Sequence, residues 1–237
     1  MRKALFMDIK KTFVTAHAGC MNTKNDSLDS VYAGISAGAD AIEVDVRFID
    51  EQIPVLSHDV LKQEQIKNIV KLEEVVNVIK TFPGIALNLD IKEADGIGFI
   101  NELLHKSDIC DRAFFTGLEP DAIINIGREY LHVPYFVNYK PDLLEINNIS
   151  HMEELACMAK DLGTIGINLH YSFATRELIE AFHGKKLKVS VWTVDNEEDI
   201  HRMIQIGVDS ITSRKVDYLV KINKEVRQCF AFGGGSQ

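Results

Sequence analysis

Several features that would tie a protein to a membrane or to an oxidising compartment are missing from this sequence. No apolar run approaches the roughly 20 residues that a membrane-spanning helix needs. The apolar run at residues 4–7 is too short for a signal peptide. The cysteines are few and show no metal-binding or redox spacing: Cys20, Cys110, Cys157 and Cys229. We therefore expect reduced thiols, a cytoplasmic location and no stable insertion into a membrane.

Positive charge is also scarce. The chain has 26 lysines and arginines against 35 aspartates and glutamates, which gives a formal net charge of -9. A strongly acidic surface repels phosphate backbones, so we exclude nucleic acid and anionic membranes as the main partners. A small anionic substrate would need local compensation from a bound metal ion and a few cationic side chains.

The chain does contain a regular alternation of short apolar runs and helical patterns. Its 237 residues are 46% hydrophobic, which is enough for one large core, and no linker divides them. We expect one domain over residues 1–230 and a flexible glycine-rich tail at residues 231–237. The predicted strands are residues 13–16, 41–46, 85–91, 113–116, 135–137, 164–169, 188–193 and 210–212.

Eight strand–helix units in a chain of this length predict a (β/α)8 TIM barrel, an α/β fold whose typical size is about 250 residues. A doubly wound open sheet is the alternative. That fold would place a glycine-rich phosphate loop after the first strand, where this sequence has His17-Ala18-Gly19-Cys20. The barrel is therefore favoured, with residues 50–55 forming a small hairpin after the second strand.

Two helices carry clear end signals. Asp26 or Ser27 can cap the first helix. Asp195 and Glu198 have the spacing of a capping box at the start of the seventh helix, which should end at Gly207.

Charged residues occupy alternate positions of two predicted barrel strands. Glu43 and Asp45 share one face of the second strand, and Asp90 and Lys92 share one face of the third. A parallel strand buried on both faces should be almost continuously apolar, so three inward carboxylates with one lysine need a cation. We predict that Glu43, Asp45 and Asp90 bind one divalent cation, Mg2+ or Ca2+, because all ligands are oxygens. A plain salt-bridge network is the alternative.

Two of the eight histidines stand apart. His17 and His58 both end predicted strands beside the carboxylates, which favours an acid/base pair. The others fall in helical or loop contexts, where a surface position is expected: His105, His132, His151, His183 and His201. The exception is His170, which lies at the inward end of the sixth strand. The single tryptophan, Trp192, has the same parity in the seventh strand and is either core or a substrate platform.

These residues, in this order, resemble the glycerophosphodiester phosphodiesterase family. The His-Arg-Gly element of the family corresponds to His17-Ala18-Gly19, and its long acidic block corresponds to G-A-D-A-I-E-V-D-V at residues 38–46. The further matches are V-L-S-H-D at 55–59, N-L-D-I-K at 88–92, W-T-V-D at 192–195 and G-V-D at 207–209. The resemblance spans nearly the whole chain.

The resemblance implies an enzyme of lipid and glycerol metabolism, a phosphoric diester hydrolase acting on a small-molecule substrate as a monomer or homodimer. It would convert glycerophosphodiesters to glycerol 3-phosphate and an alcohol through a cyclic phosphate. The implied roles are as follows: His17 and His58 as general acid and base, Glu43, Asp45 and Asp90 as metal ligands, Lys92 as a phosphate contact, and Trp192 and His170 as substrate-binding residues.

Four departures from the family pattern bear on this site. Ala18 stands where the family has arginine, which removes a bidentate phosphate donor, and Arg47 is a candidate replacement. Asp90 stands where most members have glutamate. Residues 24–27 read K-N-D-S in place of Pro-Glu-Asn-Thr. The insertion after the second histidine is cut to a short polar segment, which should leave the pocket open on one side.

Two alternatives to hydrolysis remain open at this point. A phospholipase-like or sphingomyelinase-like lyase on the same barrel would release a cyclic phosphate, and an open pocket would admit its bulkier alcohol. A non-catalytic binding protein on the same barrel would be consistent with Ala18 in place of arginine. The presence of both histidines and all three carboxylates favours the enzyme.

Overall fold

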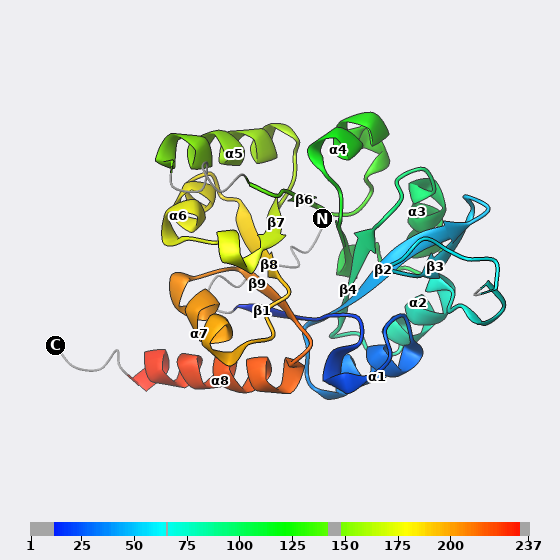
Figure 1. Cartoon of the computed structure of the whole chain (residues 1–237), viewed down its shortest axis with the longest axis horizontal. Coiled ribbons are helices and arrows are strands. Elements are labelled where there is room, and N and C mark those ends of the chain that lie inside the picture. The colour runs from blue at the N-terminus through cyan, green and yellow to red at the C-terminus, as the bar shows by residue number, and fades with distance from the viewer. Residues whose placement is uncertain (1–11, 65, 142–147, 233–237) are drawn as a thin grey trace.

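The computed structural model describes residues 12–64, 66–141 and 148–232, with side chains to residue 226 (Figure 1). The strands are β1 (Phe13–Ala16), β2 (Ala41–Ile49), β3 (Ile53–Leu56), β4 (Ala86–Ile91), β5 (Ala113–Thr116), β6 (Phe136–Asn138), β7 (Gly166–His170), β8 (Lys188–Trp192) and β9 (Ser210–Ser213). The helices are α1 (Leu28–Ser36), α2 (Leu72–Lys80), α3 (Ile97–Lys106), α4 (Pro120–Ile126), α5 (Ile149–Asp161), α6 (Arg176–Gly184), α7 (Glu197–Ile206) and α8 (Val216–Phe232). Most of the predicted tail, residues 233–237, lies outside the described residues.

Eight parallel strands form a nearly closed barrel with the helices outside it (Figure 1). Their order is β5-β4-β2-β1-β9-β8-β7-β6, and every neighbouring pair in this order is parallel. The ring is completed by a parallel bridge between Phe115 and Tyr135, where the Phe115 N–H donates to the Pro134 carbonyl at 2.9 Å. The predicted (β/α)8 barrel is confirmed, and the doubly wound open sheet is wrong.

The inward face of the strands changes character along the barrel axis. At the N-terminal end it is apolar, where Ala41, Ala86, Phe114 and Phe136 form a small buried cluster. The Phe114 and Phe136 rings meet edge to face at 6.0 Å, and the two alanines leave room for them. At the C-terminal end the same parity carries polar side chains. The apolar plug therefore closes one end of the barrel and leaves the other for chemistry.

Strand β2 runs past the barrel and pairs there with β3 in an antiparallel hairpin. Asp50 and Glu51 turn the chain with φ angles of 49° and 58°, as a tight hairpin turn requires. The predicted hairpin is confirmed, and β2 is longer than predicted because its last three residues pair with β3. The hairpin returns the chain to the barrel mouth at His58.

The two predicted helix caps have different outcomes. Ser27 caps α1, because its Oγ accepts a hydrogen bond from the Ser30 N–H at 3.2 Å. The capping box from Asp195 is wrong: Asn196, one residue closer to α7, accepts the Glu198 N–H at 2.8 Å. Helix α7 ends at Gly207 as predicted, with a φ of 89°.

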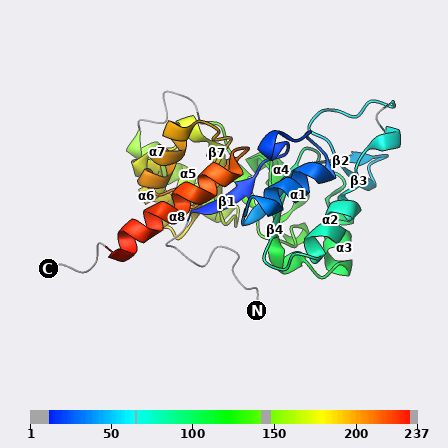
Figure 2. The same ribbon diagram turned by 90° about the horizontal axis from the view of Figure 1, so that it is seen from below.

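The last helix, α8, packs against β1 and α7 (Figure 2). Among the described residues, no helix is both long and apolar enough to cross a bilayer.

Candidate active site

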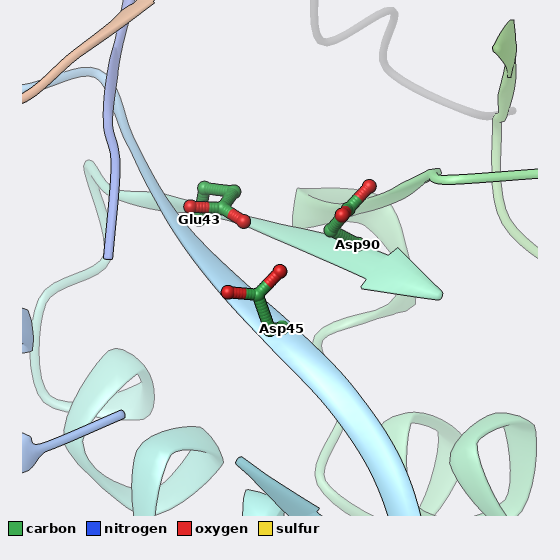
Figure 3. A group of neighbouring side chains, drawn as sticks. All are labelled: Glu43, Asp45 and Asp90. Carbon is green, nitrogen blue, oxygen red and sulfur yellow. The ribbon is translucent and has the colours of Figure 1, made fainter. Parts of the chain in front are cut away.

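Three carboxyl groups meet at the C-terminal end of the barrel. Glu43 and Asp45 project from β2 and Asp90 from β4, and Figure 3 shows the three groups facing a common space. One oxygen from each lies within 4.8 Å of the others. Glu43 and Asp45 are only 5% and 3% exposed. No other group of three His, Cys, Asp or Glu residues in the described part of the chain could hold a metal ion.

Lys92 balances this acidic cluster only in part. Its ammonium lies 2.7 Å from Asp45 Oδ1 and also contacts Asp90. Burial opposes the charge of Lys92, but these two carboxylates outweigh it and raise the pKa of the ammonium above its usual value. Burial, followed by repulsion from Asp45 and Asp90, raises the pKa of Glu43 well above its usual value. Three carboxyl groups against one ammonium leave a local deficit of positive charge, and their oxygens suit a hard divalent cation.

His17 follows β1, and hydrogen bonds fix both its backbone and its ring. Its backbone N–H donates to the Ser213 carbonyl of β9 at 3.0 Å, and its Nδ1 lies 2.8 Å from the Ala18 carbonyl. A carbonyl can only accept, so Nδ1 carries the proton and Nε2 holds the lone pair when the ring is neutral. Burial, assisted by the charge of Arg214, lowers the pKa of His17 and so favours the neutral ring. This is the form of the ring that a general base requires, and the role of His17 as a base stays a prediction.

His58 follows β3 at the edge of the mouth, and its side chain is 63% exposed. Its Nδ1 lies 2.9 Å from Asp59 Oδ1, and its carbonyl accepts two hydrogen bonds from the Arg47 guanidinium at 3.2 Å. The hydrogen bond to His58, followed by the charge of the ring, lowers the pKa of Asp59. Nδ1 is therefore the nitrogen that donates to Asp59, and Nε2 is the nitrogen left for exchange in the cavity.

The acidic cluster and both histidines line one cavity of about 510 Å3. Hydrogen bonds between neighbouring strands fix its walls. Thr116 Oγ1 on β5 lies 2.9 Å from Asn88 Oδ1 and 3.0 Å from Asp90 Oδ1. Asn168 on β7 donates through Nδ2 to Asn138 Oδ1 on β6 at 3.0 Å. These paired polar groups satisfy one another, so the cavity wall is held rigid without a ligand.

Trp192 lines the same cavity at the end of β8 and is 38% exposed. Trp192 is therefore not a core residue, and its role as a substrate platform stays a prediction. The ring of His170 stands edge-on to the indole at 5.7 Å. His170 is not among the residues that line the cavity; its Nδ1 is 2.8 Å from Ser172 Oγ, so its contact with substrate stays a prediction.

A larger hollow of about 1000 Å3 lies between α3 and α4. It is lined mainly by residues of these helices, and it shares no lining residue with the smaller cavity. Two histidines predicted to be surface residues, His105 and His132, line it. The chemistry-bearing residues are gathered in the smaller cavity, so that cavity is the candidate active site.

Comparison with known proteins shows the family of the chain. Residues 85–218 match the model of the "Glycerophosphoryl diester phosphodiesterase family", which is more than half of the chain. The chain belongs to this family. The resemblance inferred from the motifs is confirmed, and membership makes the chain a phosphoric diester hydrolase.

Relatives cover nearly the whole chain. A glycerophosphodiester phosphodiesterase of Caldanaerobacter subterraneus subsp. tengcongensis is 25% identical over 90% of this chain and 98% of its own length. A glycerophosphodiester phosphodiesterase structure from Parabacteroides distasonis has a TM-score of 0.76 at 18% identity, covering 92% of this chain and 100% of that one. An Oleispira antarctica phosphodiesterase in complex with the product sn-glycerol-3-phosphate has a TM-score of 0.71 at 20% identity, covering 92% and 97%. These two structures show the shared barrel.

The family arginine that Ala18 replaces has no substitute in Arg47. The Arg47 guanidinium donates to the His58 carbonyl at 3.2 Å and to the Glu93 carboxylate at 2.5 Å. Arg47 does not line the cavity. The expectation that Arg47 serves the substrate is therefore wrong, because its donors already hold the hairpin against the end of β4. Ala18 itself is buried, and its N–H donates to Glu43 Oε2 at 2.9 Å.

The sequence analysis missed several cavity residues, among them Thr116, Asn138, Thr212 and Arg214. The first three have inward parity at the ends of their strands, so the rule that found the carboxylates could have found them. Asn138 falls one residue beyond the strand predicted for residues 135–137. Arg214 lies after the last strand, where parity gives no signal.

Proposed function

We propose that this cavity hydrolyses glycerophosphodiesters to glycerol 3-phosphate and an alcohol, with His17 as general base and His58 as general acid in the first step. The observation that carries the proposal is the convergence of His17, His58 and the three carboxyl groups on one cavity at the strand ends. The chemical roles follow from the two histidine environments. Burial lowers the pKa of the half-buried His17 and so favours its neutral form, whereas His58 is exposed and can exchange its proton with solvent.

In the first step His17 Nε2 takes the proton from the glycerol hydroxyl next to the phosphoryl ester. The hydroxyl oxygen bonds to phosphorus, and the bond from phosphorus to the alcohol oxygen breaks. His58 donates a proton to that leaving oxygen, so a cyclic phosphate and a free alcohol result. In the second step the roles reverse: His58 accepts a proton from water, and the water oxygen bonds to phosphorus. The bond from phosphorus to the glycerol ring oxygen breaks, and His17 returns its proton to that oxygen.

Glu43, Asp45 and Asp90 would hold one divalent cation, Mg2+ or Ca2+, for this reaction. When bound, the cation would neutralise phosphate oxygens and lower the pKa of the attacking hydroxyl. Lys92 keeps Asp45 and Asp90 in place and would direct a remaining N–H to the phosphate. Trp192 would cover the glycerol moiety, with His170 buttressing the edge of the indole.

The proposal is tested by following the products from a panel of glycerophosphodiesters with wild type, His17→Ala and His58→Ala. His105→Ala is the matched control, because His105 is an exposed histidine outside this cavity. We expect each active-site variant to lose at least about 100-fold in rate, as loss of a general acid or base commonly does. Wild-type rates in both variants would overturn the histidine roles.

The same assay separates hydrolysis from the lyase reaction. Glycerol 3-phosphate as the final product supports hydrolysis, whereas a cyclic phosphate that accumulates and persists would show a lyase. If wild type cleaves no substrate of the panel, with or without Mg2+ or Ca2+, only the binding-protein alternative is left.

A further inference from the structure

Arg214 is a cationic residue that lines the cavity, and the two-histidine reaction assigns it no role. The described residues that line the cavity include two permanently charged cations, Lys92 and Arg214. The Lys92 ammonium is engaged by two carboxylates, Asp45 and Asp90, whereas one carboxylate, Asp195, engages Arg214. A phosphodiester carries a negative charge, which the divalent cation and a Lys92 N–H would offset on the β2 and β4 side of the cavity. Arg214 is the further cavity cation that is available to this anion.

Arg214 has the position for this task. It follows β9, the strand next to β1, and its carbonyl accepts the Met21 N–H at 2.9 Å. It thus lies beside the segment that begins with His17. Ala18 in that segment offers only its backbone N–H, which Glu43 already occupies.

The guanidinium of Arg214 is also held in place. Asp195 Oδ1 accepts the Arg214 backbone N–H at 2.7 Å, and Asp195 Oδ2 accepts Nη1 at 3.0 Å. Among the described residues, none accepts a hydrogen bond from Nε or Nη2. A planar guanidinium fixed on one side by a carboxylate presents its remaining N–H groups as a fork, the arrangement that recognises phosphate oxygens in pairs.

We propose that Arg214 is the substrate-binding residue that clamps the phosphodiester anion, with Asp195 as its positioning residue. This inference rests on the proposed function, because it assigns the phosphate subsite of the same cavity. It also explains why the Asp195 carboxylate binds Arg214 and does not cap α7.

The test compares Arg214→Gln, Arg214→Lys and Asp195→Asn with wild type. Arg202→Ala is the matched control: Arg202 is 43% exposed and pairs with Asp199 at 3.0 Å, against 42% and 3.0 Å for Arg214 with Asp195, but it lies outside the cavity. The readouts are kcat and KM for a glycerophosphodiester, and the Kd of sn-glycerol 3-phosphate and of neutral glycerol by calorimetry.

For Arg214→Gln we expect KM and the Kd of glycerol 3-phosphate to rise about tenfold or more, as loss of a charge-assisted hydrogen bond implies, with the affinity for glycerol unchanged. Arg214→Lys should recover part of the loss, Asp195→Asn should show a smaller rise, and Arg202→Ala should match wild type. An unchanged Kd for glycerol 3-phosphate in Arg214→Gln would overturn the inference, and so would an equal loss of affinity for glycerol. If wild type hydrolyses nothing, the proposed function fails, and the Kd comparison still decides the role of Arg214.

Discussion

Asp45 and Asp90 are register partners on adjacent parallel strands, β2 and β4, so their carboxyl groups stand side by side at one level of the barrel. Glu43 faces the same space from two residues earlier on β2, opposite Asn88. Neighbouring buried carboxylates repel one another, and one lysine compensates only part of that repulsion. The predictions below follow from this arrangement.

Replacing Asp90 or Asp45 with asparagine should abolish stabilisation by a divalent cation. Each change removes one charged oxygen ligand, so the affinity for Mg2+ or Ca2+ falls. For wild type, a cation at 100 times its Kd adds about 2.7 kcal/mol to the free energy of unfolding. Thermal unfolding with and without each cation measures the difference. Asp111→Asn, an exposed change elsewhere, is the control and should keep the wild-type response; full stabilisation of Asp90→Asn would exclude it as a ligand.

Glu43→Gln should stabilise the protein in EDTA while it abolishes activity. Burial and the two aspartates raise the pKa of Glu43 above its usual 4.5, so between pH 4.5 and the raised pKa the folded state holds a proton that the unfolded state has lost. Stability in EDTA should therefore fall as the pH rises from about 4.5 through the raised pKa, and the glutamine variant should lack this fall. We expect a gain of roughly 1–3 kcal/mol at pH 7, since removal of a buried charge of this kind is often stabilising. Urea unfolding from pH 4 to 8 measures it, and a large loss of stability would contradict the assignment.

The pH profile of kcat/KM should report the environment of His17. Burial and the nearby Arg214 lower the pKa of His17 below 6.5, and the base must be neutral to act. The acid limb of the profile should therefore lie below pH 6.5, and a bound cation moves it in the same direction. Arg214→Gln removes one of the lowering charges, so its acid limb should shift to higher pH. A limb above pH 6.5 in wild type would conflict with a lowered pKa of His17.

Trp192 should report ligand binding directly. It is the only tryptophan of the chain and lies at the cavity mouth, so its fluorescence has no background from another indole. Titration with glycerol 3-phosphate should change the emission. Trp192→Ala should raise KM severalfold and alter the free energy of unfolding by less than about 1 kcal/mol, because partly exposed residues contribute little to stability. Trp192→Phe should keep most of the affinity, and a KM equal to wild type in Trp192→Ala would argue against a platform.

The fold follows from the alternation of eight strand and helix patterns, and the acidic cluster follows from strand parity. Charged residues at alternate positions of buried strands must share one face and need partners there. The sequence alone could therefore place Glu43, Asp45 and Asp90 together. Arg214 and Arg47 show where this reasoning ends. Both are arginines near strand ends, and only tertiary structure shows that one faces the cavity while the other binds Glu93.

The capping error has a similar origin. Asp195 and Asn196 are both good N-cap residues, and sequence spacing could not choose between them. The choice depends on Arg214, which lies 19 positions along the chain and takes the Asp195 carboxylate. Long-range partners of this kind decide which of two adjacent residues serves the local structure.

Cation-dependent hydrolysis at the acidic cluster is tested most directly by the release of glycerol 3-phosphate from a glycerophosphodiester in EDTA, in Mg2+ and in Ca2+. Wild type should release it only with one of these cations, and Asp45→Asn should release little under any condition. Equal rates for wild type with EDTA and with cation, or a fully active Asp45→Asn, would contradict a metal site at Glu43, Asp45 and Asp90.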